Sequence, residues 1–242
     1  MKKIKKNINL FFKALSFGAL LISFNSCSSD DSIINELGEV NDTDFETTDW
    51  TVETHSDVVS PDFDEVFGDN AVKRLDIIIT ETRWQNMLDD MTAIYGAFGV
   101  PSSPSGGDID PISIPAEVFY NGLEWYRVGV SFEENSSLQK SWQSGILKLA
   151  FKLDFDKFED GYPEIENQRF YGFNKLILKN NFSDKLILKD KTATSELNDE
   201  NLETSRKAFF TVYVDHGQGP EYFGVYTMLE EVDETMPAEQ VL

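Results

Sequence analysis

The segment AEVFYNGLEWY (residues 116–126) decides the fold. Strand-forming residues such as Val118, Phe119 and Trp125 lie on either side of Asn121-Gly122, and an Asn-Gly pair between two such runs is a strong signal for a two-residue hairpin turn. The second strand extends through Val128, Val130 and Phe132, which alternate as expected of a strand with one buried face. The segment therefore predicts a long antiparallel hairpin as the centre of the domain.

Further strands are predicted on both sides of this hairpin from runs of β-branched and alternating apolar residues. They cover residues 72–80, 148–155, 173–180, 209–215 and 222–230. Glycine, proline and acidic residues predict the connecting segments, which are the loops 99–115 and 156–167 and the turn 216–220. Strands joined by such short connections favour antiparallel neighbours.

Two helices are predicted as well. The first covers residues 82–91, with Thr82 as its N-cap, and the second covers residues 191–203. The first helix carries a stripe of large apolar side chains at helical spacing, namely Trp84, Met87, Leu88 and Met91. We expect this stripe to pack into the core. The whole pattern predicts an α+β domain with a mainly antiparallel sheet and two helical segments.

The charge of the chain excludes some functions. The 242 residues include 21 Lys and Arg and 43 Asp and Glu, which gives a net charge of −22. Five lysines and no acidic residue precede Cys27, so the rest of the chain has 16 basic against 43 acidic residues, a net charge of −27. We expect no nucleic-acid partner, because binding to phosphate backbones depends on Lys and Arg. A single cysteine excludes a disulfide framework, and the wide separation of His55 and His216 argues against a zinc site.

The N-terminus has the composition of an export signal. Residues 1–26 begin with a basic head, continue through the apolar stretch 10–24 and end at the small Ser26. The apolar stretch is interrupted by a lysine and is shorter than the ~20 residues of a membrane-spanning helix. Cys27 resembles the lipidated cysteine of bacterial lipoproteins, although Phe24 stands where those signals usually carry Leu. An ordinary secretory signal beside an incidental cysteine is the alternative.

The segment after the signal predicts how the protein is attached. Residues 28–32 are small, polar and acidic, which resembles the export tags of surface-exposed lipoproteins in bacteria with two membranes. Residues 27–62 are predicted to form an acidic, flexible tether, and residues 63–242 the folded domain. We expect an exported lipoprotein of the outer membrane or cell surface, held in the lipid bilayer by acylation of Cys27.

Five segments together carry a family resemblance. They are residues 125–132 with Asn135-Ser136-Ser137, and residues 151–156, 167–173, 208–215 and 222–233. In order and spacing they resemble the CotH kinase family, the spore-coat-protein-H-like secreted protein kinases. The resemblance implies that the domain is similar to the N-terminal lobe of an atypical protein kinase. It also implies a family that binds ATP and a divalent metal and phosphorylates Ser or Thr in exported proteins.

The first departure from the family pattern lies at the expected phosphate site. Relatives read roughly Val-Arg-Phe-Lys-Gly-Asn-Ser-Ser, whereas residues 130–137 read VSFEENSS. Glu133 and Glu134 replace a Lys and a Gly, which would supply a cation and a close backbone approach to phosphate. Two like charges a few ångströms apart repel by about 4 kcal/mol at an effective dielectric of ~20. We therefore interpret Glu133, Asn135, Ser136 and Ser137 as positions of a degenerate nucleotide site.

Asp190 is the fifth position of that degenerate site. Relatives carry Arg-Glu-Lys at the start of a helix, whereas residues 189–191 read KDK. Protein kinases orient the phosphates with a Lys–Glu ion pair. Our hypothesis assigns these two positions to Glu133 and Asp190, which would form a like-charge pair instead.

The sequence reaches Leu242 soon after the last predicted strand, so we expect the second kinase lobe, with its catalytic and metal-binding residues, to be absent. No catalytic residue, metal site or bound cofactor is expected in this chain, and ATP and Mg²⁺ are implied by the family only. We expect a truncated, catalytically impaired family member that acts as a non-catalytic surface module and binds an exported protein partner. The alternative is an ATP- and Mg²⁺-dependent secreted Ser/Thr kinase, if the chain is a fragment of a longer protein.

Overall fold

The computed structural model describes residues 50–68, 71–102, 110–134, 136–182 and 206–231, together with the strand residues 33–34 and 40–41. The chain divides into two compact units, Met1–Asp30 and Asp31–Leu242, and the described residues all belong to the second. The helices are α1 (Val52–His55), α2 (Phe63–Phe67), α3 (Glu81–Tyr95), α4 (Ser136–Gln143) and a 3-10 helix, Pro163–Ile165. The strands are β1 (Ile33–Ile34), β2 (Val40–Asn41), β3 (Lys73–Ile78), β4 (Ile114–Tyr120), β5 (Leu123–Phe132), β6 (Phe151–Asp154), β7 (Lys175–Lys179), β8 (Lys207–Asp215) and β9 (Pro220–Glu230).

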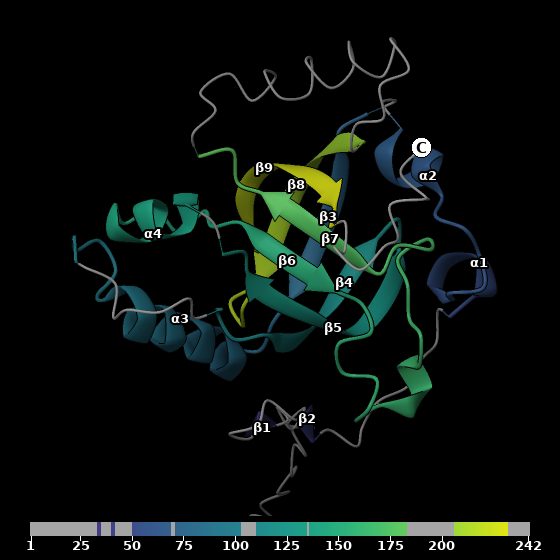
Figure 1. Cartoon of the computed structure of the whole chain (residues 1–242), viewed down its shortest axis with the longest axis horizontal. Coiled ribbons are helices and arrows are strands. Elements are labelled where there is room, and N and C mark those ends of the chain that lie inside the picture. The colour runs from purple at the N-terminus through teal and green to yellow at the C-terminus, as the bar shows by residue number, and fades with distance from the viewer. Residues whose placement is uncertain are drawn as a thin grey trace, which may run out of the picture. The chain divides into compact units, whose positions relative to one another are not determined.

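Seven of these strands close into a barrel in the order β3-β4-β5-β6-β7-β9-β8 (Figure 1). Six of the seven neighbouring pairs are antiparallel, and the barrel is closed by the parallel pair β3–β8, in which Leu75 lies opposite Val212. The short strands β1 and β2 form a separate antiparallel pair. This architecture confirms the predicted α+β fold with a mainly antiparallel sheet. Closure of the sheet was not predicted.

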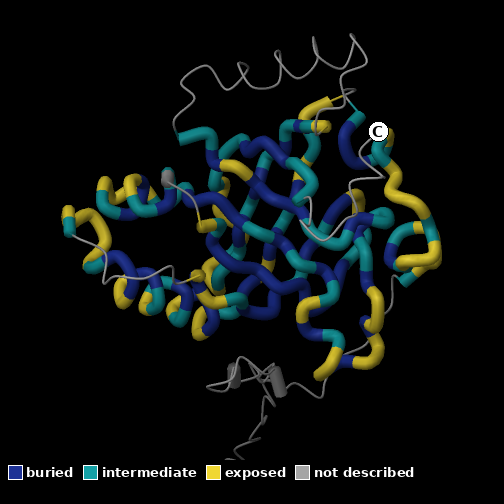
Figure 2. The backbone as a smooth tube through the Cα atoms, in the orientation of Figure 1, coloured by how far each residue is buried: buried dark blue, intermediate teal, exposed yellow. Residues whose placement is uncertain are grey.

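The interior of the barrel is filled by one face of each strand. The burial of β8 alternates strictly along its nine residues, as expected of a strand whose second face lies outside the barrel. The inward side chains are large and apolar and are almost wholly buried, among them Leu75, Ile77, Val128, Val130, Phe132, Phe151, Leu153, Leu176, Leu178, Phe210, Val212, Tyr226 and Met228. Figure 2 shows this buried centre, with the exposed positions gathered on the helices and loops around it.

The predicted hairpin is confirmed. β4 and β5 are joined by Asn121 (φ 51°) and Gly122 (φ 80°), and two successive positive φ angles are what a two-residue turn of this kind requires. A bulge follows in β5, where the register shifts opposite Glu117 and Arg127 has a φ of 49°. The Glu117 carboxylate accepts hydrogen bonds from the backbone N–H and the guanidinium of Arg127. Beyond this bulge Val128 and Val130 face inward, so Gly129 and Ser131 lie on the outer face.

The helix α3 confirms the predicted first helix, and its boundaries differ by a few residues. Its N-cap is Thr80, whose Oγ1 accepts a hydrogen bond from the Arg83 N–H at 3.3 Å, so the prediction of Thr82 as N-cap was wrong. The predicted apolar stripe of α3 faces the core, where Trp84, Met87 and Met91 are buried. The helix ends at Gly96, whose φ is 81°.

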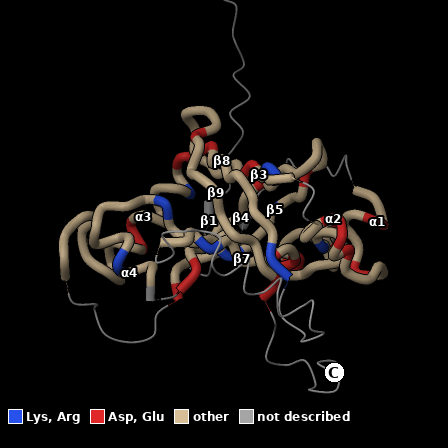
Figure 3. The backbone as a smooth tube through the Cα atoms, turned by 90° about the horizontal axis from the view of Figure 1, so that it is seen from above, with Lys and Arg blue, Asp and Glu red and all other residues tan. Residues whose placement is uncertain are grey.

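Three of the four α-helices were not predicted. α4 forms where the sequence was interpreted as part of a nucleotide site, and α1 and α2 precede the first barrel strand. α3 and α4 lie together on one side of the barrel, and α1 and α2 lie on the other (Figures 1 and 3). Residues 191–203, the second predicted helix, lie outside the described residues. Within the described part of the chain, no helix has both the length and the apolar character needed to cross a membrane.

Residues 50–62, which the sequence assigns to the tether, include a segment packed against the barrel. His55 in α1 is completely buried, and its ring stacks between Trp50 at 5.3 Å and Trp125 at 4.5 Å. The His55 Nε2 lies 2.8 Å from the carbonyl oxygen of Glu124, to which it donates a hydrogen bond. The backbone N–H groups of Arg169 and Tyr171 donate to carbonyl groups in α1. Ordered structure therefore begins before residue 63.

Candidate functional site

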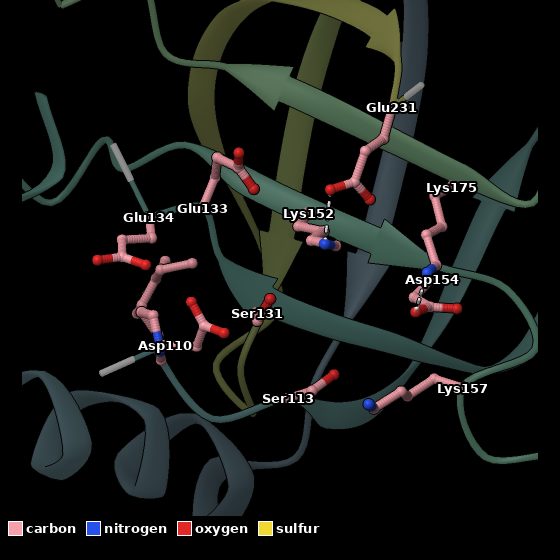
Figure 4. A pocket seen from close by; sticks show the side chains of 12 residues that line it. Asp110, Ser113, Ser131, Glu133, Glu134, Lys152, Asp154, Lys157, Lys175 and Glu231 are labelled. Atoms are coloured by element: carbon pink, nitrogen blue, oxygen red, sulfur yellow. Dashed lines mark hydrogen bonds and ion pairs between the residues drawn. The ribbon is translucent and has the colours of Figure 1, made fainter. Parts of the chain in front are cut away.

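A cavity of about 360 Å³ opens on the outer face of the barrel beside β5, β6 and β7 (Figure 4). Its lining is strongly charged, with five carboxylates and three lysines. The lining residues are Asp110, Pro111, Ser113, Ser131, Phe132, Glu133, Glu134, Lys152, Asp154, Lys157, Lys175 and Glu231. Elsewhere, Asp and Glu lie beside α1, α2 and α3 alike (Figure 3), so the negative charge of the described residues is not confined to this cavity.

Strand alternation places the central residues of the cavity on the outside of the barrel. Phe151 and Leu153 of β6 are fully buried in the core, so Lys152 and Asp154 between and after them face outward. Ser131 of β5 pairs with Lys152 of β6, and Asp154 pairs with Lys175 of β7. The register of three neighbouring strands thus brings these four polar residues together.

A glycine shapes the floor of the cavity. Gly129 of β5 leaves room for Lys157, and a Cβ atom at Gly129 would lie only 2.6 Å from the Lys157 Cβ and 2.8 Å from its Cγ. The stem of Lys157 therefore lies directly on the β5 backbone, which only a glycine at this position permits without a shift. Any side chain at residue 129 would displace Lys157 from the cavity.

Two ion pairs use lysines of the cavity. The Lys152 Nζ donates to the Glu231 Oε1 at 2.7 Å, and the Lys175 Nζ lies 3.7 Å from the Asp154 Oδ2. Two further carboxylate oxygens of these pairs, Asp154 Oδ1 and Glu231 Oε2, are buried and accept no hydrogen bond from any described residue. Buried acceptors of this kind require a donor from water or from a ligand.

Two acidic side chains of the cavity, Glu133 and Asp154, have raised pKa values. Burial raises the pKa of Glu133, and the nearby Glu231 raises it further, against the opposing effect of Lys152. Burial also raises the pKa of Asp154, to about 6, with Lys175 opposing and the neighbouring Asp156 adding to the rise. The pKa of Lys152 is lowered by burial, but Glu231 and the other nearby carboxylates leave it above its ordinary value. The cavity therefore favours the charged form of Lys152 and the protonated forms of Glu133 and Asp154.

The structure brings together only part of the predicted nucleotide site. Glu133 lines the cavity, beside Glu134. Ser137 lies in α4 and does not line the cavity. Ser136 begins α4, and nothing is described of its side chain. Asn135, Asp190 and Cys27 lie outside the described residues, so the predicted Glu133–Asp190 pair and the lipidation site stay predictions.

Four further residues of the cavity were not predicted as site residues, namely Lys152, Asp154, Lys175 and Glu231. A signal for the first two was present, because the alternation of residues 148–155 places Lys152 and Asp154 on one face. Pairing Lys152 with Glu231 requires knowledge that both flank β7 in a closed barrel, which the local pattern does not contain.

The charges of the cavity do not fit a nucleoside triphosphate. Two of its lysines already contact carboxylates, and its carboxylates outnumber its lysines. A triphosphate needs cations and N–H donors aimed at its oxygens, whereas Glu133 and Glu231 present acceptors to this space. In the described part of the chain, no three His, Cys, Asp or Glu residues are grouped so that they could hold a metal ion. We therefore derive no phosphoryl-transfer step at this cavity.

A comparison with protein families identifies part of the chain. Residues 139–242 match the family model described as CotH kinase protein. The matched region includes Lys152, Asp154, Lys175 and Glu231 of the cavity, and it begins shortly after Glu133 and Glu134. The match supports the resemblance over this region and is shorter than the region over which the sequence resemblance was drawn. No curated protein matches the chain.

Proposed function

We propose that the whole chain is a member of the CotH kinase family that works as a non-catalytic binding module of an exported lipoprotein. The family match over residues 139–242 supports the family assignment. The basic and apolar segment before Cys27 supports export and acylation. The barrel then serves as a rigid scaffold that presents its outer cavity to a protein partner.

The charge arrangement around Lys152 carries the proposal that the module is non-catalytic. Its ammonium group is held by Glu231 at 2.7 Å and has Glu133 nearby, so this lysine is already neutralised. In kinases a strand lysine keeps its ion pair with one glutamate while it contacts the phosphates of ATP. Lys152 has Glu133 and Asp154 near it in addition to Glu231, so the charge around its ammonium group is net negative and repels phosphate.

Phosphate transfer from radiolabelled ATP tests this proposal. The purified chain is incubated with ATP labelled at the γ-phosphate, a generic acceptor protein and either Mg²⁺ or EDTA. We expect no metal-dependent label on the acceptor or on the chain itself. Metal-dependent transfer that is lost in the Lys152→Met variant would overturn the proposal.

The alternative function is an ATP- and Mg²⁺-dependent secreted Ser/Thr kinase in which further residues complete the site. The description of the matching family favours it. The same transfer assay on a longer product of the gene separates the two functions. Activity of a longer product together with inactivity of the 242-residue chain would assign catalysis to the additional residues.

Lipid attachment has its own test. We expect cells that express the protein to incorporate labelled palmitate into it, and to retain it in the membrane fraction. The Cys27→Ser variant should lose the label and leave the membrane fraction, because the thiol that would carry the acyl chain is gone. Label that persists in Cys27→Ser would contradict acylation at this residue.

A further inference from the structure

The outer cavity separates its charges into two ends. Glu133, Glu134 and Asp110 lie at one end, and Lys157 and Lys175 lie with Asp154 at the other (Figure 4). The acids of the first end act on one another, since Asp110 raises the pKa of Glu133, and both lysines of the second end lower that of Asp154. The neutralised pair of Lys152 and Glu231 lies between the two ends.

The register of β5 gives the distance between the ends. Gly129, which supports Lys157, pairs with Asp154, and the Glu133 N–H donates to the Ala150 carbonyl oxygen at 2.9 Å. Residues 129 and 133 are four positions apart on an extended strand, which corresponds to about 13 Å. An extended peptide covers this distance with side chains at positions i and i+4, which point to the same face.

Each end holds a charged group that no other described residue neutralises by contact. Lys157 forms no ion pair within the described part of the chain, while Lys175 is 3.7 Å from Asp154. At the opposite end, Glu133 forms neither an ion pair nor a side-chain hydrogen bond with the residues that the structure describes, and it is partly buried. An incoming cation at Glu133 and an incoming anion at Lys157 would both gain a partner.

Two carboxylate oxygens of the cavity lack a hydrogen-bond donor among the described residues. Asp154 Oδ1 and Glu231 Oε2 are buried and accept nothing from the described residues. The backbone N–H groups of a peptide can donate to carboxylates such as those of Asp154 and Glu231, whereas a triphosphate brings only more acceptors. The lining also differs from that of an ordinary small-molecule pocket, which is mostly apolar, because Pro111 and Phe132 are the only apolar lining residues.

We propose that this cavity binds an extended peptide segment of a protein partner, with a basic side chain against Glu133 and Glu134 and an acidic side chain against Lys157. The proposal deepens the proposed function, on which it rests, by naming the chemistry of the partner. The two charged groups of the segment are four residues apart, and the segment's backbone N–H groups point toward Asp154 and Glu231.

Fluorescence anisotropy with labelled peptides and the full chain tests this proposal. The probe is a blocked seven-residue peptide of Ala, Ser and Thr with Arg at the second position and Glu at the sixth. Two control peptides replace either the Arg or the Glu by Gln. We expect the probe to bind at least about tenfold more tightly than either control, because each charge contributes a separate contact.

Variants of the chain assign the two ends. Glu133→Gln should weaken binding of the probe about fivefold to tenfold and leave binding of the peptide without Arg unchanged. Lys157→Met keeps the stem of the side chain on Gly129. It should weaken binding of the probe about fivefold to tenfold and leave binding of the peptide without Glu unchanged. Glu164→Gln, at an exposed position outside the cavity, should bind like the unmodified chain. Circular dichroism of each variant establishes that it is folded.

Equal binding of all three peptides, or absence of binding at a peptide concentration of about 1 mM, would overturn the peptide proposal. Unchanged binding to folded Glu133→Gln and Lys157→Met would do the same. None of these results bears on catalysis, which is tested separately by phosphate transfer from ATP. Failure to bind the peptides can therefore be found either with or without catalytic activity, and the two assays distinguish these outcomes.

Discussion

Lys152 of β6 and Glu231, the residue after β9, form an ion pair with 2.7 Å between Nζ and Oε1, across the intervening strand β7. Their side chains keep 32% and 25% of their exposed surface. The pair is therefore screened less than a surface pair but is not sealed in the core. It fixes a cation in the centre of the outer cavity, where Glu231 offsets its charge.

Lys152→Met should lower the free energy of unfolding by about 1–2 kcal/mol, because Glu231 and Glu133 then lie partly buried without the ammonium group of Lys152. Urea unfolding of the variant and the unmodified chain measures the difference. Arg74→Met is the matched control, since Arg74 pairs with Asp76 on the surface and retains 55% of its side-chain exposure. The loss in the control should be smaller. Equal losses in the two variants would contradict a special role for the Lys152–Glu231 pair.

Asp154→Asn should change how stability depends on pH. The pKa of Asp154 is about 6 in the folded chain and close to 4 when unfolded, so the folded state holds the proton more tightly between these values. Stability contributed by this proton is present below about pH 4 and is lost as the pH rises through 6. The unmodified chain should lose at most about 3 kcal/mol over this range relative to Asp154→Asn.

Urea unfolding at a series of pH values from 4 to 7 measures this difference between the two chains. Carboxylates that do not interact with Asp154 titrate alike in both chains and cancel in the comparison. A difference that is independent of pH, or one that grows in the opposite direction, would contradict the raised pKa of Asp154.

The double variant Glu133→Lys with Glu134→Gly should raise the affinity for ATP, because it replaces two carboxylates of the cavity by a cation and a glycine. An increase of about tenfold or more over the unmodified chain is expected in a calorimetric titration with ATP and Mg²⁺. Glu164→Lys with Glu166→Gly makes the same change in net charge at exposed positions outside the cavity. If both variants gain affinity equally, the effect belongs to net charge and not to this site.

His55→Ala should loosen the segment before α2 from the barrel. The substitution removes a fully buried ring between Trp50 and Trp125, together with its hydrogen bond to the Glu124 carbonyl oxygen. A loss of about 2–4 kcal/mol in the free energy of unfolding is expected from the cavity and the lost hydrogen bond together. Hydrogen exchange should speed up at residues 50–62 in particular. If hydrogen exchange became faster to the same extent throughout the barrel, this would contradict a local role of His55 in holding residues 50–62.

The sequence predicted the barrel strands well where the evidence for them is local. The Asn121-Gly122 turn and the alternation around it depend only on neighbouring residues, and both appear in the structure. Closure of the barrel depends on the β3–β8 pair, in which Leu75 meets Val212. Nothing in either strand alone indicates a partner so far away in the chain, so closure could not be predicted.

The candidate site was predicted only in part, for a similar reason. Glu133 was found because it departs from a family pattern, and it does line the cavity. Its neighbours Lys152 and Glu231 come from strands that meet only after folding. α4 was missed because Ser136 and Ser137 were interpreted as phosphate-binding residues and not as the first turn of a helix. His55 gave no local signal, since its burial depends on Trp125 in β5.

The affinity of the unmodified chain for ATP tests most directly whether this cavity is unsuited to triphosphate. Isothermal titration calorimetry of the purified protein with ATP and Mg²⁺ is the measurement. We expect no heat of binding at nucleotide concentrations up to about 1 mM, because the lysines of the cavity are outnumbered by its carboxylates. A micromolar dissociation constant that Lys152→Met abolishes would contradict the claim that this cavity is unsuited to triphosphate.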